Sequence, residues 1–495
     1  MDIKFSFAKN PSIKKGGLAI LLKTSFSDIS GLHFVCSPNS IMRAASIKNF
    51  IGESKSYLNI LDPVDCVWDR LIVIGVGDPN SKLFSWLNTG GNAASYIEED
   101  KNIEIFIDIP EYSISESKIR DFVLGCMLKI YKFDRYKTKN TDKSSIKSDG
   151  KNISVTIITQ VIEKSNEIIE DIKSVVNGVN LARDIVNEPA NVLGTDEFCE
   201  KVRSLESLGV EVEILDKDAM HNLGMQALLA VSQGSIRPPY LAVMKWNGGN
   251  EEEKPLAFIG KGVVFDSGGI SIKPSNGMEE MKGDLAGAAA VTGLFRVLAE
   301  RKAKVNAIGI LALVENMPGA SAQRPGDIVR SMSGQTIEVS NTDAEGRLIL
   351  ADALWYCRTH YNPCVMIDLA TLTGAIVVSL GNIYAGLFSN NDNLAEKLVS
   401  SGLSSGELLW RMPMNEEYGK LIESKFADMK NIGGRGAGSI VAAHFLEKFV
   451  DKTLWAHIDI AGTATGNHFK DINQSWASGF GVRLLDEFIR SFYEK

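Results

Sequence analysis

The spacing of hydrophobic residues predicts alternating strands and helices in the first third of the chain. Short apolar runs at residues 71–75 and 153–159 have the length of buried strands. Between them, residues 115–131 carry apolar side chains at helical spacing, namely Ile119, Phe122, Val123, Cys126, Met127 and Ile130. Residues 137–152 are polar and lack any apolar period, so a loop is predicted there.

A longer amphipathic pattern runs from residue 162 to about residue 186, and Pro189 ends it because proline cannot continue the hydrogen-bond ladder of a helix. Beyond it, apolar runs at residues 256–259, 305–313, 364–369 and 455–460 alternate with helical patterns. This alternation is typical of an α/β fold with a central, mostly parallel sheet flanked by helices. We expect two domains: a smaller N-terminal α/β domain (1–160), a linker helix (161–188) and a larger C-terminal α/β domain (189–495).

Length and composition agree with a folded enzyme of two domains. The 495 residues exceed the size of one ordinary hydrophobic core, and the hydrophobic (44%) and charged (23%) fractions are those of an average globular protein. The first ten residues carry no apolar run of a signal peptide, and no stretch approaches the roughly 18 apolar residues of a membrane span. We therefore expect a cytoplasmic protein without a membrane partner.

The formal net charge of −8 disfavours nucleic acid as a partner, because binding to a phosphate backbone depends on Lys and Arg. Residues 129–151 form a locally basic stretch, which we interpret as a solvated loop, with a nucleic-acid patch as the alternative. The six cysteines form no Cys-x-x-Cys pair and are interpreted as reduced thiols in the core.

Candidate chemistry begins in residues 260–275 (GKGVVFDSGGISIKPS), which follow a predicted strand and contain Lys261, Asp266 and Lys273. Glycine permits positive φ and lets the backbone approach a bound group closely. Asp284 comes nine residues after this stretch and opens the run DLAGAAAV. Such a run suits a tightly packed helix that has an acidic residue at its positive end.

A second constellation lies in residues 341–348 (NTDAEGRL), between a strand-like segment at 336–340 and an apolar helix from Leu348. In an extended segment, residues i and i+2 point the same way. Asp343 and Glu345 are therefore predicted to aim two carboxylates at one point, with Arg347 on the same side.

Four carboxylates gathered in one place repel one another unless cations neutralise them. Two divalent ions, roughly 3.5–4 Å apart, balance four carboxylates and can activate water and clamp a carbonyl. Oxygen-rich ligation admits Mg²⁺ and Mn²⁺ as well as Zn²⁺. A lysine that binds such an ion must be neutral, whereas a lysine slightly farther away stays protonated and can polarise a substrate carbonyl. Any one of these acids alone is more often a helix cap or a turn residue.

Lys261, Asp266, Lys273 and Asp284, followed by NTDAEGRL, resemble the signature of the leucyl aminopeptidase (cytosol aminopeptidase) family. The likeness continues in residues 187–191 (NEPAN), 370–375 (ATLTGA) and 455–462 (WAHIDIAG), so it covers the chain from about residue 190 to its end. The first 160 residues match the family only loosely, in size and layout. The resemblance implies a two-metal aminopeptidase that hydrolyses the N-terminal bond of peptides with a free amine.

The family's site implies a role for each matching residue. One metal is expected to be held by Lys261, Asp266, Asp284 and Glu345, and the other by Asp266, Asp343 and Glu345 with the backbone carbonyl of Asp343. A metal-bridging water is the expected nucleophile, and Lys273 would stabilise the oxyanion. Arg347 would hold a bicarbonate ion that serves as the general base. The metals implied are Mn²⁺ or Zn²⁺, with Mg²⁺ or Co²⁺ as alternatives.

The resemblance also implies a pocket for the first side chain of the substrate and a homohexamer. The pocket residues are expected to be Met281, Thr371, Leu372, Thr373, Gly374, Ala461 and Ala464. Some family members carry methionine at the position of Ala464, so the smaller alanine predicts a roomier pocket. We therefore expect a broad preference that includes leucine.

Two other functions stay open on the residues alone. Another two-metal hydrolase, such as a phosphoesterase, would need a basic phosphate clamp, for which Lys273 and Arg347 are the candidates. A DNA-binding role, known for some bacterial relatives, would depend on residues 129–151. His457 lies in an apolar strand and is expected to be a core residue.

Overall fold

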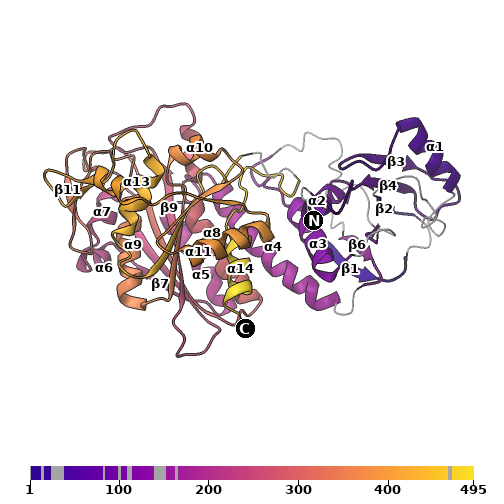
Figure 1. Ribbon diagram of the computed structural model, residues 1–495, viewed down its shortest axis with the longest axis horizontal. Helices are drawn as coiled ribbons and strands as arrows, with labels where there is room; N and C mark the ends of the chain where they lie inside the picture. Colours follow the sequence, from indigo (N-terminus) through magenta and orange to yellow (C-terminus); the bar gives the residue numbers. More distant parts are fainter. Residues whose placement is uncertain are drawn as a thin grey trace. The chain divides into compact units, whose positions relative to one another are not determined.

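The computed structural model describes residues 2–12, 16–23, 38–81, 84–97, 102–108, 114–138, 152–161, 165–466 and 471–494. The chain divides into two compact units (Figure 1). Unit 1 comprises Met1–Val176 and Phe469–Gln474, and unit 2 comprises Asn177–His468 and Ser475–Lys495. The boundary between them falls within one long helix, α4 (Ser165–Asn187).

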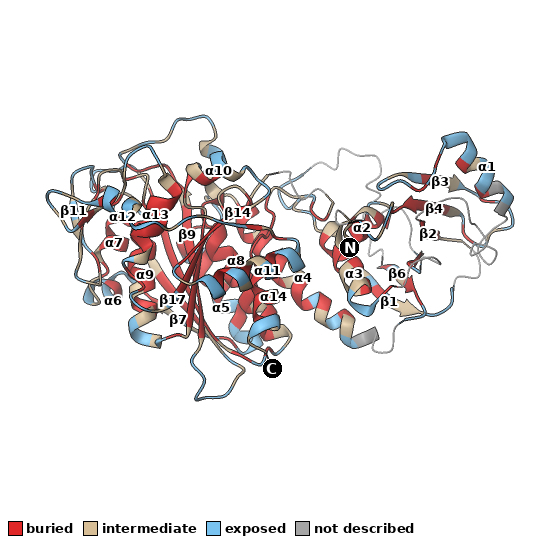
Figure 2. Cartoon of the chain, viewed as in Figure 1, coloured by how far each residue is buried: buried red, intermediate tan, exposed pale blue. Residues whose placement is uncertain are grey.

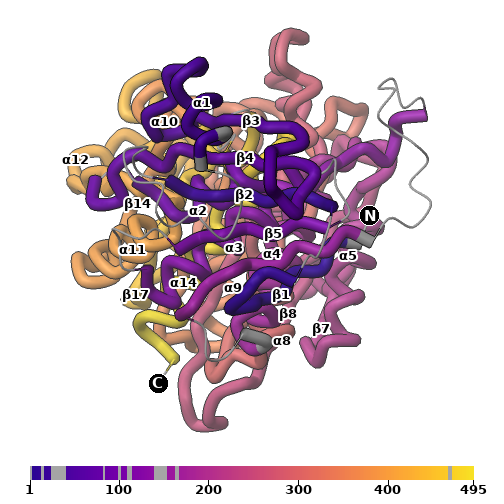
Figure 3. Tube along the Cα trace, turned by 90° about the vertical axis from the view of Figure 1, so that its right-hand side faces the viewer, coloured from indigo at the N-terminus to yellow at the C-terminus, as the bar shows by residue number. Residues whose placement is uncertain are grey.

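Unit 1 is built on a six-stranded sheet in the order β1-β6-β5-β2-β4-β3. Figure 3 labels β1 to β5 of this sheet. All neighbouring strands are parallel except β3, which is antiparallel to β4. The strands and helices of unit 1 are β1 (Asp2–Ala8), β2 (Leu18–Lys23), α1 (Pro38–Lys48), β3 (Tyr57–Leu61), β4 (Arg70–Gly75), α2 (Trp86–Ala94), β5 (Asn102–Phe106), α3 (Glu116–Ile130) and β6 (Asn152–Ile158).

Unit 2 contains an eight-stranded sheet in the order β15-β14-β17-β13-β9-β10-β8-β7. Its four central strands, β17, β13, β9 and β10, are parallel, and antiparallel neighbours flank them on both sides. A small sheet, β11-β12-β16, lies apart. The strands are β7 (Glu211–Leu215), β8 (Tyr240–Asn247), β9 (Leu256–Asp266), β10 (Asn306–Asn316), β11 (Ile328–Arg330), β12 (Thr336–Glu338), β13 (Val365–Ala370), β14 (Ala385–Ser389), β15 (Leu409–Arg411), β16 (Met429–Lys430) and β17 (Leu454–Asp459).

Helices cover both faces of the large sheet and bury its central strands (Figure 2). α8 packs on the face that carries Gly260 and Gly309, whereas α7, α9 and α13 share a hydrophobic cluster with Ala257 and Ile259 on the other face. The helices of unit 2 after α4 are α5 (Thr195–Arg203), η3 (Ser204–Leu208), α6 (Lys217–Asn222), α7 (Gln226–Ser232), η4 (Met278–Gly283), α8 (Ala286–Glu300), α9 (Gly346–Tyr361), α10 (Gly374–Leu380), α11 (Asp392–Ser405), α12 (Glu416–Gly419), η5 (Lys420–Ile422), α13 (Gly438–Glu447) and α14 (Val482–Phe492).

The predicted α/β class, with a smaller and a larger α/β part, is confirmed, and the predicted strands and helices lie within a few residues of β4, β6, β9, β10, β13, β17, α3 and α4. One cysteine differs from the prediction, because Cys66 is disulfide-bonded and not a reduced thiol. The basic stretch of residues 129–151 lies largely outside the described residues, from 139 onward. No helix in the described part of the chain is long and apolar enough to cross a membrane.

We expect Gly287→Ala to destabilise the metal-free protein by about 1–3 kcal/mol, because a side chain cannot fit between α8 and β13. A Cβ at this position would lie 2.0 Å from the backbone oxygen of Leu369. Gly436→Ala is the matched control, since a Cβ there would meet no heavy atom within 4 Å. Thermal unfolding of both variants measures the difference, and equal melting temperatures would contradict this packing.

Candidate active site

Asp266 ends the central strand β9 and is held in place by two donors. Its Oδ1 accepts hydrogen bonds from the backbone N–H of Gly268 at 2.9 Å and from Nδ2 of Asn316, at the end of β10, at 2.8 Å. Gly268 has φ +87°, and a Cβ there would lie 2.9 Å from Oδ1 of Asp343. Glycine is therefore required at this position both for the turn and for the approach of the second acidic stretch.

Thr342 joins the two acidic stretches that the sequence separates by more than 70 residues. Its hydroxyl donates to the carbonyl of Gly268 at 2.6 Å and accepts from the N–H of Ser271 at 2.8 Å. As a result, carboxylate oxygens of Asp266, Asp343 and Glu345 lie within 4.8 Å of one another.

The predicted convergence of Asp343 and Glu345 arises by a different local geometry. Residues 342 and 343 form a turn, and Glu345 has helical φ and ψ of −79° and −36° as the residue before α9. The prediction of an extended segment is therefore wrong here. The turn, and not strand alternation, brings the two carboxylates together.

Lys261 lies in the middle of the buried cluster, with only 3% of its side chain exposed. Its Nζ is 2.8 Å from Oδ1 of Asp284, 2.8 Å from Oε1 of Glu345 and 2.8 Å from the carbonyl oxygen of Thr371. These three acceptors match the three hydrogens of an ammonium group. Burial opposes the charged form, but the neighbouring carboxylates outweigh it and raise the pKa of Lys261.

Asp284 lies between η4 and α8, two residues before the first residue of α8. Its Oδ1 accepts a hydrogen bond from the hydroxyl of Thr371 at 2.7 Å in addition to the contact with Lys261. Its role is therefore an ion-pair partner in the cluster and not a cap of α8.

Lys273 occupies the outer side of the cluster. Its Nζ lies 2.7 Å from Oδ2 of Asp266 and 2.5 Å from Oδ1 of Asp343, and 19% of its side chain is exposed. The two lysines thus divide the cluster, with Lys261 buried between Asp284 and Glu345 and Lys273 accessible between the other two acids.

The cluster is short of positive charge. With all four carboxyls ionised, the acids carry −4 and the two ammonium groups carry +2, which leaves −2 in a largely buried space. Burial raises the pKa of Asp284 to about 8; Lys261 opposes this shift, and Glu345 and Asp266 add to it. Burial with Glu345 raises the pKa of Asp266 to about 6. Oδ2 of Asp284 and Oε2 of Glu345 are buried without a hydrogen-bond partner among the described residues. Hard divalent cations fit such a set of oxygens.

Arg347 in α9 is buried but touches a different group. Its Nη1 donates to the carbonyl oxygen of Asn431 at 2.7 Å, and its Nε has no hydrogen-bond partner among the described residues. Burial lowers the pKa of Arg347 to about 10, a shift that the charges of Glu345 and Asp459 oppose. The guanidinium therefore stays charged at neutral pH.

The residues predicted to form the substrate pocket come from three segments of unit 2. Met281 lies in η4 and is half-buried; Ala461 is half-buried and Ala464 buried after β17. Residues 371–373 connect β13 to α10, which begins at Gly374, and Thr373 caps α10 by accepting from the N–H of Ile376 at 3.2 Å. Thr371 belongs to the cluster itself, through Lys261 and Asp284.

Three supporting residues were not predicted from the sequence: Asn316, Asn431 and Asp459. Each is a polar residue buried where a strand ends, or directly after one. That placement is the signal by which they could have been found. His457 is buried in β17 as expected, and its Nδ1 lies 2.6 Å from Oδ1 of Asp368.

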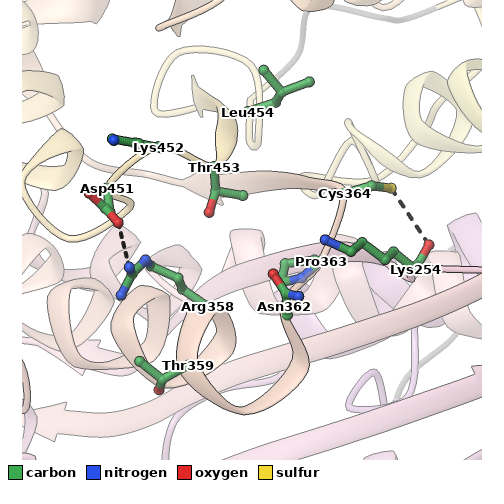
Figure 4. A pocket seen from close by; sticks show the side chains of 10 residues that line it. All are labelled: Lys254, Arg358, Thr359, Asn362, Pro363, Cys364, Asp451, Lys452, Thr453 and Leu454. Atoms are coloured by element: carbon green, nitrogen blue, oxygen red, sulfur yellow. Dashed lines mark hydrogen bonds and ion pairs between the residues drawn. The ribbon is translucent and has the colours of Figure 1, made fainter.

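A cavity of about 660 Å³ lies at the opposite edge of the sheet, near the amino ends of β9, β13 and β17 (Figure 4). It is lined by Lys254, Cys364 and Thr453 among others, and Arg358 at its wall is paired with Asp451. None of the predicted site residues lines it. The acidic cluster, at the carboxyl ends of the same strands, is the site that the sequence singled out.

Comparison with protein families decides between the functions that the cluster admits. The model of the catalytic domain of the cytosol aminopeptidase family matches residues 180–486, more than half of the chain. The chain belongs to the cytosol aminopeptidase family. The model of the N-terminal domain of the same family matches residues 35–140.

Relatives of this family cover the chain from end to end. A probable cytosol aminopeptidase of Rhizobium johnstonii is 57% identical and covers 100% of this chain and 99% of its own, and one of Sinorhizobium fredii is 55% identical over 100% of both chains. Among solved structures, a mutant of tomato leucine aminopeptidase has a TM-score of 0.85 at 32% identity and covers 99% of this chain and 96% of its own. The bottromycin maturation enzyme BotP in complex with Mn has a TM-score of 0.83 at 27% identity and covers 97% of this chain and 100% of its own.

Membership in the cytosol aminopeptidase family confirms the predicted enzyme class, a metal-dependent aminopeptidase and thus a hydrolase of peptides. It favours this activity over the phosphoesterase that the residues alone left open. The acidic cluster, short of positive charge, fits the metal dependence of the family.

We expect the stabilisation of the protein by Mn²⁺ to grow as the pH rises from about 5.5 to about 8, because an ion held by this cluster would have to displace protons from Asp266 and Asp284. The pKa of both carboxyls is raised in the folded, metal-free protein, to about 6 and about 8. Their contribution to metal-free stability is therefore full below the ordinary carboxyl pKa and is lost as pH rises through these values. Melting temperatures with chelator and with Mn²⁺ across this range measure the effect; an increment independent of pH would contradict it.

Proposed function

We propose that this chain releases the N-terminal residue of peptides with a free amine by means of two divalent metal ions held at the acidic cluster. Lys261, Asp266, Asp284 and Glu345 would hold one ion, and Asp266, Asp343 and Glu345, with the backbone carbonyl of Asp343, would hold the other. The observation that carries this proposal is the buried excess of negative charge, with carboxylate oxygens of Asp284 and Glu345 that lack partners among the described residues. Bound divalent ions supply an activated water and polarise the scissile carbonyl.

Lys273 is proposed to stabilise the oxyanion that develops on the scissile carbonyl. Burial opposes its charged form, but Asp266 and Glu345 outweigh it and raise the pKa of Lys273, so the group is an ammonium at neutral pH. Its partial exposure, in contrast to Lys261, supports contact with a substrate. A fixed donor aimed at developing charge is among the strongest contributions to hydrolysis.

Arg347 is proposed to hold a bicarbonate ion that accepts the proton of the attacking water. The bond from its Nη1 to Asn431 fixes the guanidinium, and the Nε without a partner among the described residues leaves a donor for an anion. A bound bicarbonate would serve as the general base.

The first side chain of the substrate is proposed to occupy a pocket formed by Met281, Thr371, Leu372, Thr373, Gly374, Ala461 and Ala464. The small side chain of Ala464 supports a broad preference that includes leucine. We further propose Mn²⁺ or Zn²⁺ as the physiological metals, with Mg²⁺ or Co²⁺ as alternatives, and a homohexamer in the cytoplasm. The domains proposed are residues 1–160, the linker helix 161–188 and the catalytic part 189–495.

We expect the chelated protein to regain hydrolysis of leucyl amide on addition of Mn²⁺ or Zn²⁺ and to leave N-acetyl-leucyl amide intact. A free amine is needed because it is to bind within the acidic cluster. Release of amino acid from a panel of aminoacyl amides measures the activity and its preference. Equal turnover of the acetylated substrate, or of a phosphate ester in place of the amide, would overturn the proposal.

We expect Lys273→Ala to lower kcat by about 10²–10³-fold, which is the usual effect of losing an oxyanion donor. Its metal content, measured by elemental analysis, should stay close to that of the unchanged protein, since Lys273 is not a proposed ligand. Lys245→Ala is the control, because Lys245 is a partly exposed lysine of the same unit that pairs only loosely with Glu213, at 3.8 Å. Full activity of Lys273→Ala would remove this lysine from the mechanism.

A further inference from the structure

Asp459 is a fully buried carboxylate at the carboxyl end of β17. Its charge acts on Arg347, but its hydrogen bonds go to none of the residues proposed to hold an ion. The strand β17 lies between β13 and β14, where Asp459 is paired in register with Ala370 and Gly386. A buried charge is costly unless several donors compensate it. The donors around this carboxylate therefore show which segments of the chain it holds in place.

Three donors from two separate segments converge on Asp459. Its Oδ1 accepts from the backbone N–H of Leu372 at 3.1 Å and from that of Ala461 at 3.2 Å. Its Oδ2 accepts from the hydroxyl of Thr373 at 2.7 Å. One carboxylate thus ties the segment after β13 to the segment after β17.

These two segments supply most of the proposed substrate pocket. We propose that Asp459 is a positioning residue that sets the shape of this pocket, and hence the selectivity for the first side chain, without touching the substrate. The inference rests on the proposed function, because it needs residues 371–374 and 461–464 to line the pocket.

Thr373 links Asp459 to the start of α10 by two hydrogen bonds. The hydroxyl donates its hydrogen to Asp459 while its oxygen accepts from the N–H of Ile376 at 3.2 Å. A hydroxyl has one hydrogen to donate, so the carboxylate decides where it points. Loss of the carboxylate would therefore release Leu372 and Thr373 and weaken the hydrogen bond by which Thr373 caps α10.

The same segment also reaches the acidic cluster through Thr371. Its carbonyl oxygen accepts from Lys261 at 2.8 Å, and its hydroxyl donates to Asp284 at 2.7 Å. These contacts are made by Thr371 itself, whereas Asp459 holds the next two residues. A change at Asp459 is therefore expected to act mainly on the pocket and only weakly on metal content.

An amide cannot replace this carboxylate fully. In Asp459→Asn, one oxygen can still accept from both backbone N–H groups, but the NH₂ group faces the hydroxyl of Thr373, which then has no acceptor for its hydrogen. The amide can donate to the oxygen of Thr373, but the variant removes the bond in which the hydroxyl donates, and it keeps the volume of the side chain. Thr373→Val removes the same bond from the other side.

The test measures kcat and KM for leucyl and alanyl amides in the metal-loaded protein. For Asp459→Asn we expect the ratio of kcat/KM between leucyl and alanyl amide to fall by about tenfold, mainly through KM, because a loosened pocket loses contacts with the larger side chain. Metal content by elemental analysis should remain near that of the unchanged protein. Thr373→Val should show a similar fall, and Thr373→Ser, which keeps the hydroxyl, should restore most of the ratio.

Asp352→Asn is the matched control for the loss of a buried carboxylate. Asp352 is also fully buried and accepts from two backbone N–H groups, those of Leu228 at 2.9 Å and Met332 at 2.7 Å, neither of them in the proposed pocket. The variant Asp352→Asn should lower the melting temperature and leave the ratio of kcat/KM between leucyl and alanyl amide unchanged. A ratio within twofold of the unchanged protein in both Asp459→Asn and Thr373→Val, or an equal fall in Asp352→Asn, would overturn the inference.

The outcomes separate this inference from the proposed function. If the unchanged protein fails to release amino acid from any amide, the proposed function falls. If the unchanged protein is active but Asp459→Asn and Thr373→Val leave the ratio of kcat/KM unchanged, only the proposed role of Asp459 is wrong. Should Asp459→Asn fail to fold, the pair Thr373→Val and Thr373→Ser still tests the same hydrogen bond.

Discussion

The mutual repulsion of four carboxylates in a buried space is the constraint on which the rest of the site depends. Two lysines can neutralise only half of their charge when all four are ionised. Burial first, with the neighbouring carboxylates adding to it, raises the pKa of Asp266 and of Asp284. Such a cluster is stable only if rigid neighbours hold the acids together and cations compensate them. Asn316 and Thr342 supply the first condition. Asn316 bonds to both acidic stretches, and Thr342, which belongs to the second stretch, bonds to Gly268 and Ser271 in the first. The metal dependence of the cytosol aminopeptidase family supplies the second.

The parallel arrangement of the central strands explains why residues so far apart in the sequence meet. β9, β13 and β17 are parallel neighbours, so Asp266, Thr371 and Asp459 follow or end three strands at the same edge of the sheet. α8 and α9 then begin near that edge, and the glycines at their first turns let them approach closely. Gly346, for example, leaves room for Lys261, since a Cβ there would lie 2.7 Å from the Cε of that lysine.

The sequence predicts the fold class and the acidic residues well, but not the way in which they converge. The strands carry long apolar runs, and the octapeptide NTDAEGRL is specific, so both are visible without a structure. The turn at residues 342–343 is not, because its shape depends on bonds from Thr342 to Gly268 and Ser271, more than 70 residues away. Asn316, Asn431 and Asp459 escaped prediction for the same reason: each bonds to groups that lie far away in the sequence. The disulfide bond of Cys66 likewise has no local pattern in the sequence.

The two lysines of the cluster have the same side chain but different surroundings, and these surroundings give them different properties. Lys261 meets three acceptors in a space closed to solvent, so it is free to bind an ion only if that ion displaces its proton. Lys273 meets two carboxylates and solvent, so it can keep its proton and turn toward an incoming oxygen. The difference follows from where each lies: Lys261 is within β9, beneath α9, whereas Lys273 is in the loop after β9. Position relative to the edge of the sheet thus distinguishes the lysine proposed as a ligand from the lysine proposed as a donor to the oxyanion.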